Sequence, residues 1–336
     1  MKSFFGFGFP FFVKTIIPGI IGALLLWPVI CFSSMKIGID KSIFANTFIS
    51  LEMIFIGLII LIGFTLNFMD DFIYRLYEGY VLWPNILRKN LTQRLNKKIA
   101  KLKKRKDETD DLIKERIIWE KLMKFPLKED RTEMDTQAYL PTRLGNIIYS
   151  YEDYPMSRYG MSSMFFWDRL WMAIDKETRS EIKGIWAHAD CILYISFVLL
   201  LSSLVYYLVF LLDIFNIPTL ILGKKIFEHS AAGIIPSNTL IFLGAGIVCM
   251  FLSYLFYLMS LPLHYRNGMV FQSMFDLHRD KLEVIAELKE SDIKKWKRLW
   301  AYLKYGLIQC SKCSKYYPTC MDECPYCKES EEDSSP

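Results

Sequence analysis

The sequence lacks the short motifs that define the common nucleotide-binding and hydrolytic enzymes. It contains no GxxxxGK[ST] phosphate loop, no HExxH helix, no GxSxG nucleophile turn and no dinucleotide-binding glycine fingerprint. These absences lower the weight of an enzymatic function without excluding one. The net charge of +5 is also modest, so it does not by itself indicate a nucleic-acid-binding protein.

What the sequence does contain is long apolar runs. It is 52% hydrophobic, yet 23% of its residues are charged, which is typical of membrane spans joined to aqueous parts. A spanning helix needs roughly 20 apolar residues. Four runs meet this length: Thr15–Ser33, Phe48–Phe68, Ala189–Leu212 and Thr239–Leu263. No small-x-small cleavage site follows the first run, so we expect a retained span and not a signal peptide.

The placement of lysine and arginine predicts the orientation of these spans. The run KKIAKLKKRK at 97–106 lies between spans two and three, whereas the connections Ser34–Thr47 and Asp213–Asn238 carry two lysines each. Because cytoplasmic loops of membrane proteins are enriched in basic residues, we expect both termini in the cytosol of a cell-membrane protein. Whether loop 213–238 re-enters the membrane stays open.

The fold class we predict is an all-α membrane protein with four transmembrane helices, a cytosolic helical domain and a C-terminal zinc ribbon. The expected parts are an interfacial aromatic N-terminus (1–14), transmembrane helices 1 and 2 (15–71), a cytosolic helical domain (72–185), transmembrane helices 3 and 4 (186–265), cytosolic amphipathic helices (266–305), the zinc ribbon (306–328) and a disordered acidic tail (329–336).

The basic stretch after span two has three interpretations. Leu91, Leu95, Ile99 and Leu102 keep a helical spacing, with lysines on the other faces. A second helix follows KDETDD at 106–111, giving either a helical hairpin or one bent helix. The lysines form a solvated face that follows the positive-inside bias, or they bind anionic lipid headgroups, or they bind nucleic acid.

Residues 140–174 combine many aromatic side chains with a few charges. The stretches PTRLGN, YEDYP, RYG and WDRLW, together with FDLHRD after span four, resemble an uncharacterised family of prokaryotic multi-pass membrane proteins. The resemblance covers residues 140–290. It implies a shared membrane architecture and no particular activity, and it does not include the cysteine-rich tail.

The C-terminal cysteines predict a structural metal site. Cys310 and Cys313 form one C-x2-C pair, and Cys324 and Cys327 form a second pair ten residues later. Four thiolates at this spacing suit a tetrahedral structural Zn2+, and so short a segment needs metal to fold. Cys320 is either a spare thiol or a substitute for Cys324, and iron is the minor alternative to zinc.

A second group of polar residues clusters at the ends of the spans. These candidates for a pore, a proton relay or a second metal site are Glu52, His188, Asp190, His264, Asp276, His278 and Asp280. Glu52 lies one turn into span two. His278 falls on an apolar helical stripe, so a packed histidine with one hydrogen bond is the simpler interpretation.

These patterns favour a homo-oligomeric pore or membrane effector that is controlled through its cytosolic domain. The expected partners are the lipid bilayer, further copies of the chain and a cytosolic protein that docks on the ribbon; nucleic acid is a weaker candidate. One alternative is a membrane scaffold that recruits a protein or nucleic acid. Another is a membrane enzyme that acts at the cytosolic lipid interface.

Overall fold

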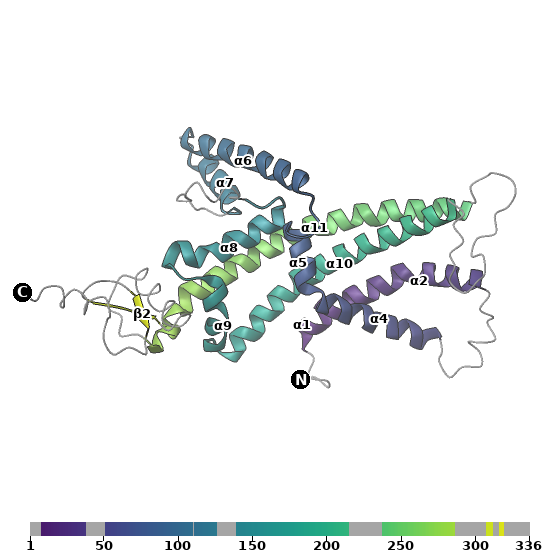
Figure 1. Cartoon of the computed structure of the whole chain (residues 1–336), viewed down its shortest axis with the longest axis horizontal. Coiled ribbons are helices and arrows are strands. Elements are labelled where there is room, and N and C mark those ends of the chain that lie inside the picture. The colour runs from purple at the N-terminus through teal and green to yellow at the C-terminus, as the bar shows by residue number, and fades with distance from the viewer. Residues whose placement is uncertain are drawn as a thin grey trace, which may run out of the picture. The chain divides into compact units, whose positions relative to one another are not determined.

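The computed structural model describes residues 8–37, 51–109, 111–125, 139–214, 237–285, 307–311 and 316–318. These residues are almost entirely helical, apart from two short strands (Figure 1). The all-α prediction is therefore confirmed for the described part of the chain. The chain divides into two compact units, the first comprising Met1–Trp83 with Glu181–His264 and the second Pro84–Ser180 with Tyr265–Pro336.

The first unit holds the apolar helices. Its elements are α1 (Phe9–Phe11), η1 (Phe12–Ile16), α2 (Ile17–Ile37), α4 (Leu51–Phe68), α5 (Asp70–Glu78) and most of α10 (Lys176–Ile214) and α11 (Ser237–His278). Three helices among the described residues are long and apolar enough to cross a membrane. The pair α4 and α5 makes a fourth if it is counted as one span, although it is bent by 60°. Three or four helices among the described residues are thus compatible with membrane insertion.

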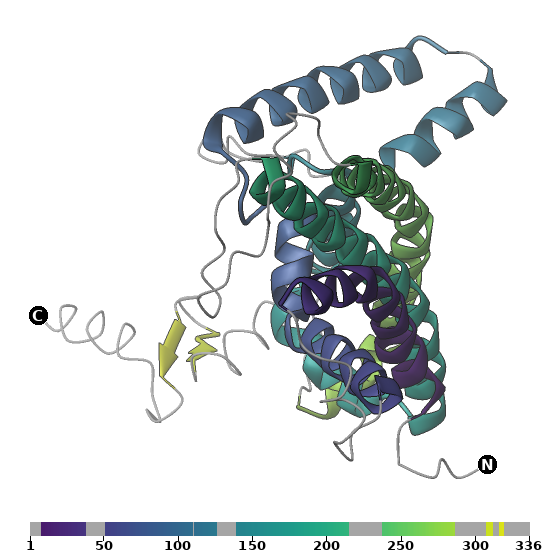
Figure 2. The same cartoon turned by 90° about the vertical axis from the view of Figure 1, so that its right-hand side faces the viewer.

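Close packing of α2 against α4 depends on two glycines. A Cβ atom at Gly19 would lie 2.5 Å from the carbonyl oxygen of Ile59, and one at Gly63 would lie 2.6 Å from the carbonyl oxygen of Thr15. Only residues without a side chain let two helix backbones approach this closely. Figure 2 shows α2 and α4 lying side by side. The close approach of α2 and α4 therefore depends on Gly19 and Gly63.

Serine side chains join α10 to α11. The Ser196 hydroxyl donates to the Ser253 carbonyl oxygen, the Ser253 hydroxyl donates to the Ser196 carbonyl oxygen, and each bond is 2.8 Å long. Cys191 and Cys249 are buried in the apolar core of the same unit, as expected for small hydrophobic residues. Small polar residues that bond across the helix interface satisfy their groups without contact with water.

The second unit contains the remaining helices. They are α6 (Asn85–Asp107), α7 (Leu112–Leu122), α8 (Arg143–Tyr159), α9 (Ser163–Ala173) and the 3-10 helix η2 (Arg279–Ile285). The α6 and α7 helices pack against each other, so of the two predicted arrangements the helical hairpin is found (Figure 1). The α11 helix continues through the boundary predicted at residue 265, so no separate amphipathic helix begins there.

The PTRLGN motif is a helix-capping device. The Thr142 side chain accepts a 3.0 Å hydrogen bond from the Gly145 N–H at the start of α8. The buried Asn146 amide group donates to the Leu140 carbonyl oxygen at 2.7 Å and accepts from the Leu140 N–H at 3.0 Å. The motif thereby ties the preceding chain to the first turn of α8. These hydrogen bonds give Thr142, Gly145 and Asn146 a structural role.

The tail has one described feature. Strands β1 (Leu307–Gln309) and β2 (Tyr316–Pro318) pair antiparallel, with Ile308 opposite Tyr317. Cys310 directly follows β1 and is buried. The other three predicted zinc ligands, Cys313, Cys324 and Cys327, lie outside the described residues, as do Cys320 and the acidic tail.

Candidate functional site: a buried charge cluster

Three charged side chains from three separate helical segments meet in the first unit. The Lys14 Nζ atom lies 3.0 Å from Asp70 Oδ2 and 2.8 Å from Asp190 Oδ2. Two tyrosines complete the contacts: the Tyr194 hydroxyl donates to Asp70 at 2.6 Å, and the Tyr74 hydroxyl donates to Asp190 at 2.5 Å. We call these five residues the charge cluster. Every carboxylate in it accepts bonds from both an ammonium group and a phenol.

The charge cluster is largely removed from water. The Asp190 side chain keeps 13% of its accessible surface, the Lys14 side chain 22% and the Asp70 side chain 39%. Two carboxylates face one ammonium group, so a fully ionised cluster carries one net negative charge. The two phenol donors offset part of that charge, because hydrogen bonds to an ionised acceptor are stronger than neutral ones.

The backbone is irregular at two of the three charged residues. Lys14 lies inside the π-helical turn η1, and Asp70 is the first residue of α5, directly after the bend from α4. The π-turns of helices and the breaks in spanning helices occur frequently at functional sites. Here both irregularities place a charged side chain in the same cluster.

His264 adjoins the charge cluster through Tyr74. The two rings meet edge to face, with their centroids 5.6 Å apart. His264 is 2% exposed, and its Nε2 atom has no hydrogen-bond partner among the described residues. Asp190 and His264, which the sequence placed near the same membrane face, are therefore linked by one tyrosine that touches both.

The other candidates from the sequence lie apart from the charge cluster. His188 is exposed, and its Nδ1 atom lies 2.7 Å from the Gly184 carbonyl oxygen. Glu52 is exposed in the first turn of α4. Within the described ranges, no three histidine, cysteine, aspartate or glutamate side chains are grouped closely enough to hold a metal ion.

Asp276 organises a separate polar group in the second unit. It accepts a 2.9 Å hydrogen bond from the Tyr154 hydroxyl and a 2.5 Å bond from the Tyr159 hydroxyl. The Arg279 guanidinium stacks 4.5 Å from the centre of the Tyr159 ring. The neighbouring YEDYP and RYG stretches of α8 thus meet the distant FDLHRD stretch at one carboxylate. His278 and Asp280 have no part in these bonds; Asp280 is exposed.

Burial raises the pKa of the Tyr154 and Tyr159 hydroxyls, and the hydrogen bonds to Asp276 raise it further. Because the pKa of these hydroxyls is higher in the folded chain, their contribution to the free energy of unfolding is fully present below the unfolded-state pKa of about 10. It is lost as the pH rises above that value, because the unfolded chain then releases protons that the folded chain retains.

Asp276→Ala should lower the free energy of unfolding by about 1–3 kcal/mol, because two tyrosine hydroxyls lose their common acceptor. Asp280→Ala is the matched control, since Asp280 is 71% exposed and lies 4.0 Å from Arg279. The control should change stability by less than about 1 kcal/mol. Hydrogen–deuterium exchange of α8 peptides measures both effects, and equal exchange in the two variants would contradict the assignment.

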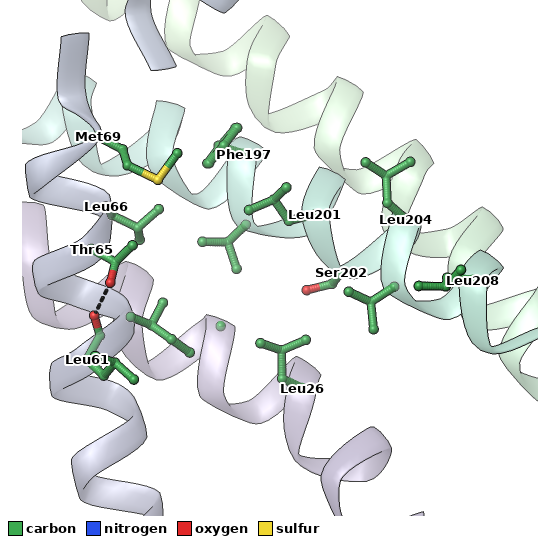
Figure 3. Close-up of a pocket in the computed structure, with 14 residues that line it drawn as sticks. Leu26, Leu61, Thr65, Leu66, Met69, Phe197, Leu201, Ser202, Leu204 and Leu208 are labelled. Carbon is green, nitrogen blue, oxygen red and sulfur yellow. Dashed lines mark hydrogen bonds between the residues drawn. The ribbon is translucent and has the colours of Figure 1, made fainter. Parts of the chain in front are cut away.

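An apolar crevice of about 440 Å³ opens between α2, α4 and α10. Figure 3 shows side chains of the three helices pointing toward it, among them Leu26, Leu61 and Leu204, with the Ser202 hydroxyl as a polar exception. The Thr65 hydroxyl near its rim donates back to the Leu61 carbonyl oxygen at 2.7 Å. The described part of the chain does not fill this space with its own side chains.

Sequence reasoning identified Asp190 and His264 but missed Lys14, Asp70, Tyr74 and Tyr194. A signal was present. Lys14 precedes the first apolar run, Asp70 follows the second and Asp190 opens the third, so an up-and-down arrangement brings all three to one membrane face. The tyrosines carried no signal of their own in so aromatic a sequence.

Comparison with known proteins assigns no family to the chain: no protein-family model, no curated protein and no solved structure matches it at a significant level. The class of protein therefore follows from the structure alone. It is a helical protein with three or four helices suited to membrane insertion and with a buried charge cluster among them.

Proposed function

We propose that this chain is an integral membrane protein that acts as a homo-oligomeric pore or membrane effector, controlled through its helical part outside the spans. The observation that carries this proposal is the charge cluster at two backbone irregularities. Ionisable side chains among spanning helices are costly and usually serve ion pathways, proton relays or switches. A purely structural bundle is often at least as stable with apolar residues of similar size at such positions.

The cluster is suited to a conformational switch. Lys14 bridges carboxylates from α5 and α10, and the bend between α4 and α5 lies directly before Asp70. Because Asp70 and Tyr74 both lie on α5, a change in the bend angle would move them together, separating Asp70 from Lys14 and Tyr74 from Asp190. A switch needs two conformations whose free energies differ by only a few kcal/mol. The paired and separated states of the charge cluster would be two such conformations.

Two further features support the oligomeric, four-span form of the proposal. The apolar crevice beside α4 and α10 is large enough to receive side chains of a neighbouring subunit. If α4 and α5 are counted as one bent span, the chain has four spans, and an even number of spans supports both termini lying on the same side. The basic residues of 97–106 assign that side to the cytosol of a cell-membrane protein.

The test combines native mass spectrometry with ion flux in proteoliposomes that contain the purified full chain. We expect a symmetric homo-oligomer and a flux above that of protein-free liposomes. Asp70→Asn should change the flux at least severalfold. Asp71→Asn is the matched control, because Asp71 is the next residue, is 78% exposed and pairs only with the exposed Arg75 among the described charges. A monomer without flux would contradict the proposal.

A zinc ribbon in the tail is a second proposal, favoured by a specific observation. β1 pairs antiparallel with β2, and the buried Cys310 directly follows β1. In the sequence, Cys310 and Cys313 both lie between the two strands, and two such C-x2-C pairs suit a tetrahedral four-cysteine zinc site. Its closed coordination leaves no open position for catalysis, so we assign it to docking or assembly, as a membrane scaffold would use it.

We expect one zinc ion per chain, lost when Cys324 and Cys327 are both replaced by serine. The reason is that two thiolates alone cannot hold a structural tetrahedral zinc ion. Metal analysis of the purified protein measures this, with Cys249→Ala as a control because that cysteine is buried in the first unit. Retention of zinc by the double variant, or its loss from the control, would contradict the ligand assignment.

A further inference from the structure

The hairpin of α6 and α7 (residues 85–122) carries more than the entire net positive charge of the chain. It has thirteen lysines and arginines against six acidic residues, whereas the whole chain is only +5. Ten of the basic side chains lie on α6, whose only acidic residue is Asp107. The rest of the chain is therefore net negative, and the hairpin is a concentrated cationic surface.

The same hairpin exposes aliphatic side chains that its own packing does not use. Ile99 of α6 and Leu122 of α7 are buried and form its inner face. On α7, Leu112 is nevertheless 80% exposed and Ile113 73% exposed, and Ile117 is exposed one turn later. A solvated helix is normally polar on its outer face. Leu112, Ile113 and Ile117 thus form an exposed apolar patch on α7, next to the exposed charges of Arg116 and Glu120.

Two observations indicate which partner covers the exposed residues of the hairpin: its positive charge and its short link to α5. A nucleic acid would neutralise the lysines but would leave the aliphatic side chains in water. An anionic bilayer surface satisfies both, because the aliphatic groups enter the headgroup–acyl boundary while lysine and arginine reach the lipid phosphates. The hairpin is also tethered to the bilayer, since α6 begins seven residues after the last residue of α5, which belongs to a candidate span.

We propose that the α6–α7 hairpin is an anionic-lipid-binding arm. It lies on the membrane surface with Leu112, Ile113 and Ile117 inserted at the headgroup boundary and with the α6 lysines bound to lipid phosphates. The proposal is independent of any pore function, since it concerns only where this arm rests. In this proposal, anionic lipids of the bilayer are ligands of the second unit.

The test is hydrogen–deuterium exchange of the full chain in nanodiscs of phosphatidylcholine, with or without added phosphatidylglycerol. The anionic lipid should slow exchange in peptides of α7 by about tenfold, and high salt should reverse much of this slowing. Replacing Ile113 and Ile117 with serine should abolish it. Replacing Lys97, Lys98 and Lys101 with glutamine should remove most of the tenfold slowing, because each lysine near the surface strengthens lipid binding by about fivefold.

The matched control replaces Met164 and Met172, exposed apolar residues on α9, with serine and should keep the full lipid effect. Three results would overturn the proposal. The first is exchange that is equal in both lipids. The second is protection of α7 by added double-stranded DNA or RNA in phosphatidylcholine discs, which would assign the arm to nucleic acid. The third is protection that depends on a second copy per disc, which would assign the apolar patch to self-association.

Discussion

Lys14→Met should lower the free energy of unfolding by about 3 kcal/mol, the largest loss expected from any single change in the charge cluster. The substitution keeps the length of the side chain but leaves Asp70 and Asp190 facing each other without the ammonium group that lies 3.0 Å and 2.8 Å from them. The two carboxylates then repel each other without a counter-ion, and the buried Asp190 has also lost most of its hydration. Equilibrium unfolding of the detergent-solubilised protein in a graded series of denaturant measures the loss.

The matched control for this prediction is Arg75→Met. Arg75 pairs with Asp71 at 3.1 Å, but both side chains are more than half exposed, so water replaces the lost partner. Its loss should cost less than about 1 kcal/mol. The double variant Lys14→Met with Asp190→Asn should recover part of the stability, since it removes one of the stranded charges. Equal losses from Lys14→Met and Arg75→Met would show that the cluster is not a buried ion group.

Gly63→Ala should destabilise the α2–α4 pair by about 1–3 kcal/mol, which is the usual range for overpacking a tight contact. The new Cβ would lie 2.6 Å from the Thr15 carbonyl oxygen and 3.0 Å from Thr15 Cγ2. A backbone atom cannot rotate out of the way, so the two helices must separate. Gly19→Ala should behave alike, because its Cβ would meet the Ile59 carbonyl oxygen at 2.5 Å. Thermal unfolding of the purified protein measures both.

Gly57→Ala is the control within the same helix. A Cβ at Gly57 meets no atom within 4 Å, so the substitution adds no clash. Alanine favours the helix by up to about 1 kcal/mol relative to glycine, and the control should leave stability unchanged or raise it. The two substitutions are chemically identical and are expected to act in opposite directions. A loss of stability at Gly57 as large as that at Gly63 would refute the close-contact explanation.

The helical, membrane-suited character of the chain could be predicted from the sequence because it depends on local quantities. The length of an apolar run and the spacing of leucines in α6 determine a helix with little help from distant residues. The start of the first helix was less predictable. Its aromatic residues suggested an interfacial segment up to Lys14, whereas the helix already begins at Phe9.

The candidate site was only partly accessible from the sequence. Asp190 and His264 were singled out because histidines and carboxylates that converge at one membrane face can bind a metal ion or relay protons. Lys14 and Asp70 looked like ordinary flanking charges, which anchor spans at the interface without further function. Their pairing depends on the π-turn at Phe12–Ile16 and the bend at Met69. Pro18 lies two residues after the π-turn, whereas no proline or glycine lies at the bend, so little in the sequence indicates the break before Asp70.

The sequence by itself determined the helices, the apolar runs, the concentration of positive charge on residues 85–122 and the paired cysteines of the tail. Each is a property of neighbouring residues, whose spacing and chemistry act over a few turns. Only the tertiary structure decided that Lys14, Asp70 and Asp190 share one buried cluster, that Tyr154 and Tyr159 bind Asp276, and that the apolar patch of α7 is exposed. These contacts join residues far apart in the chain, and their geometry depends on how whole helices bend and pack.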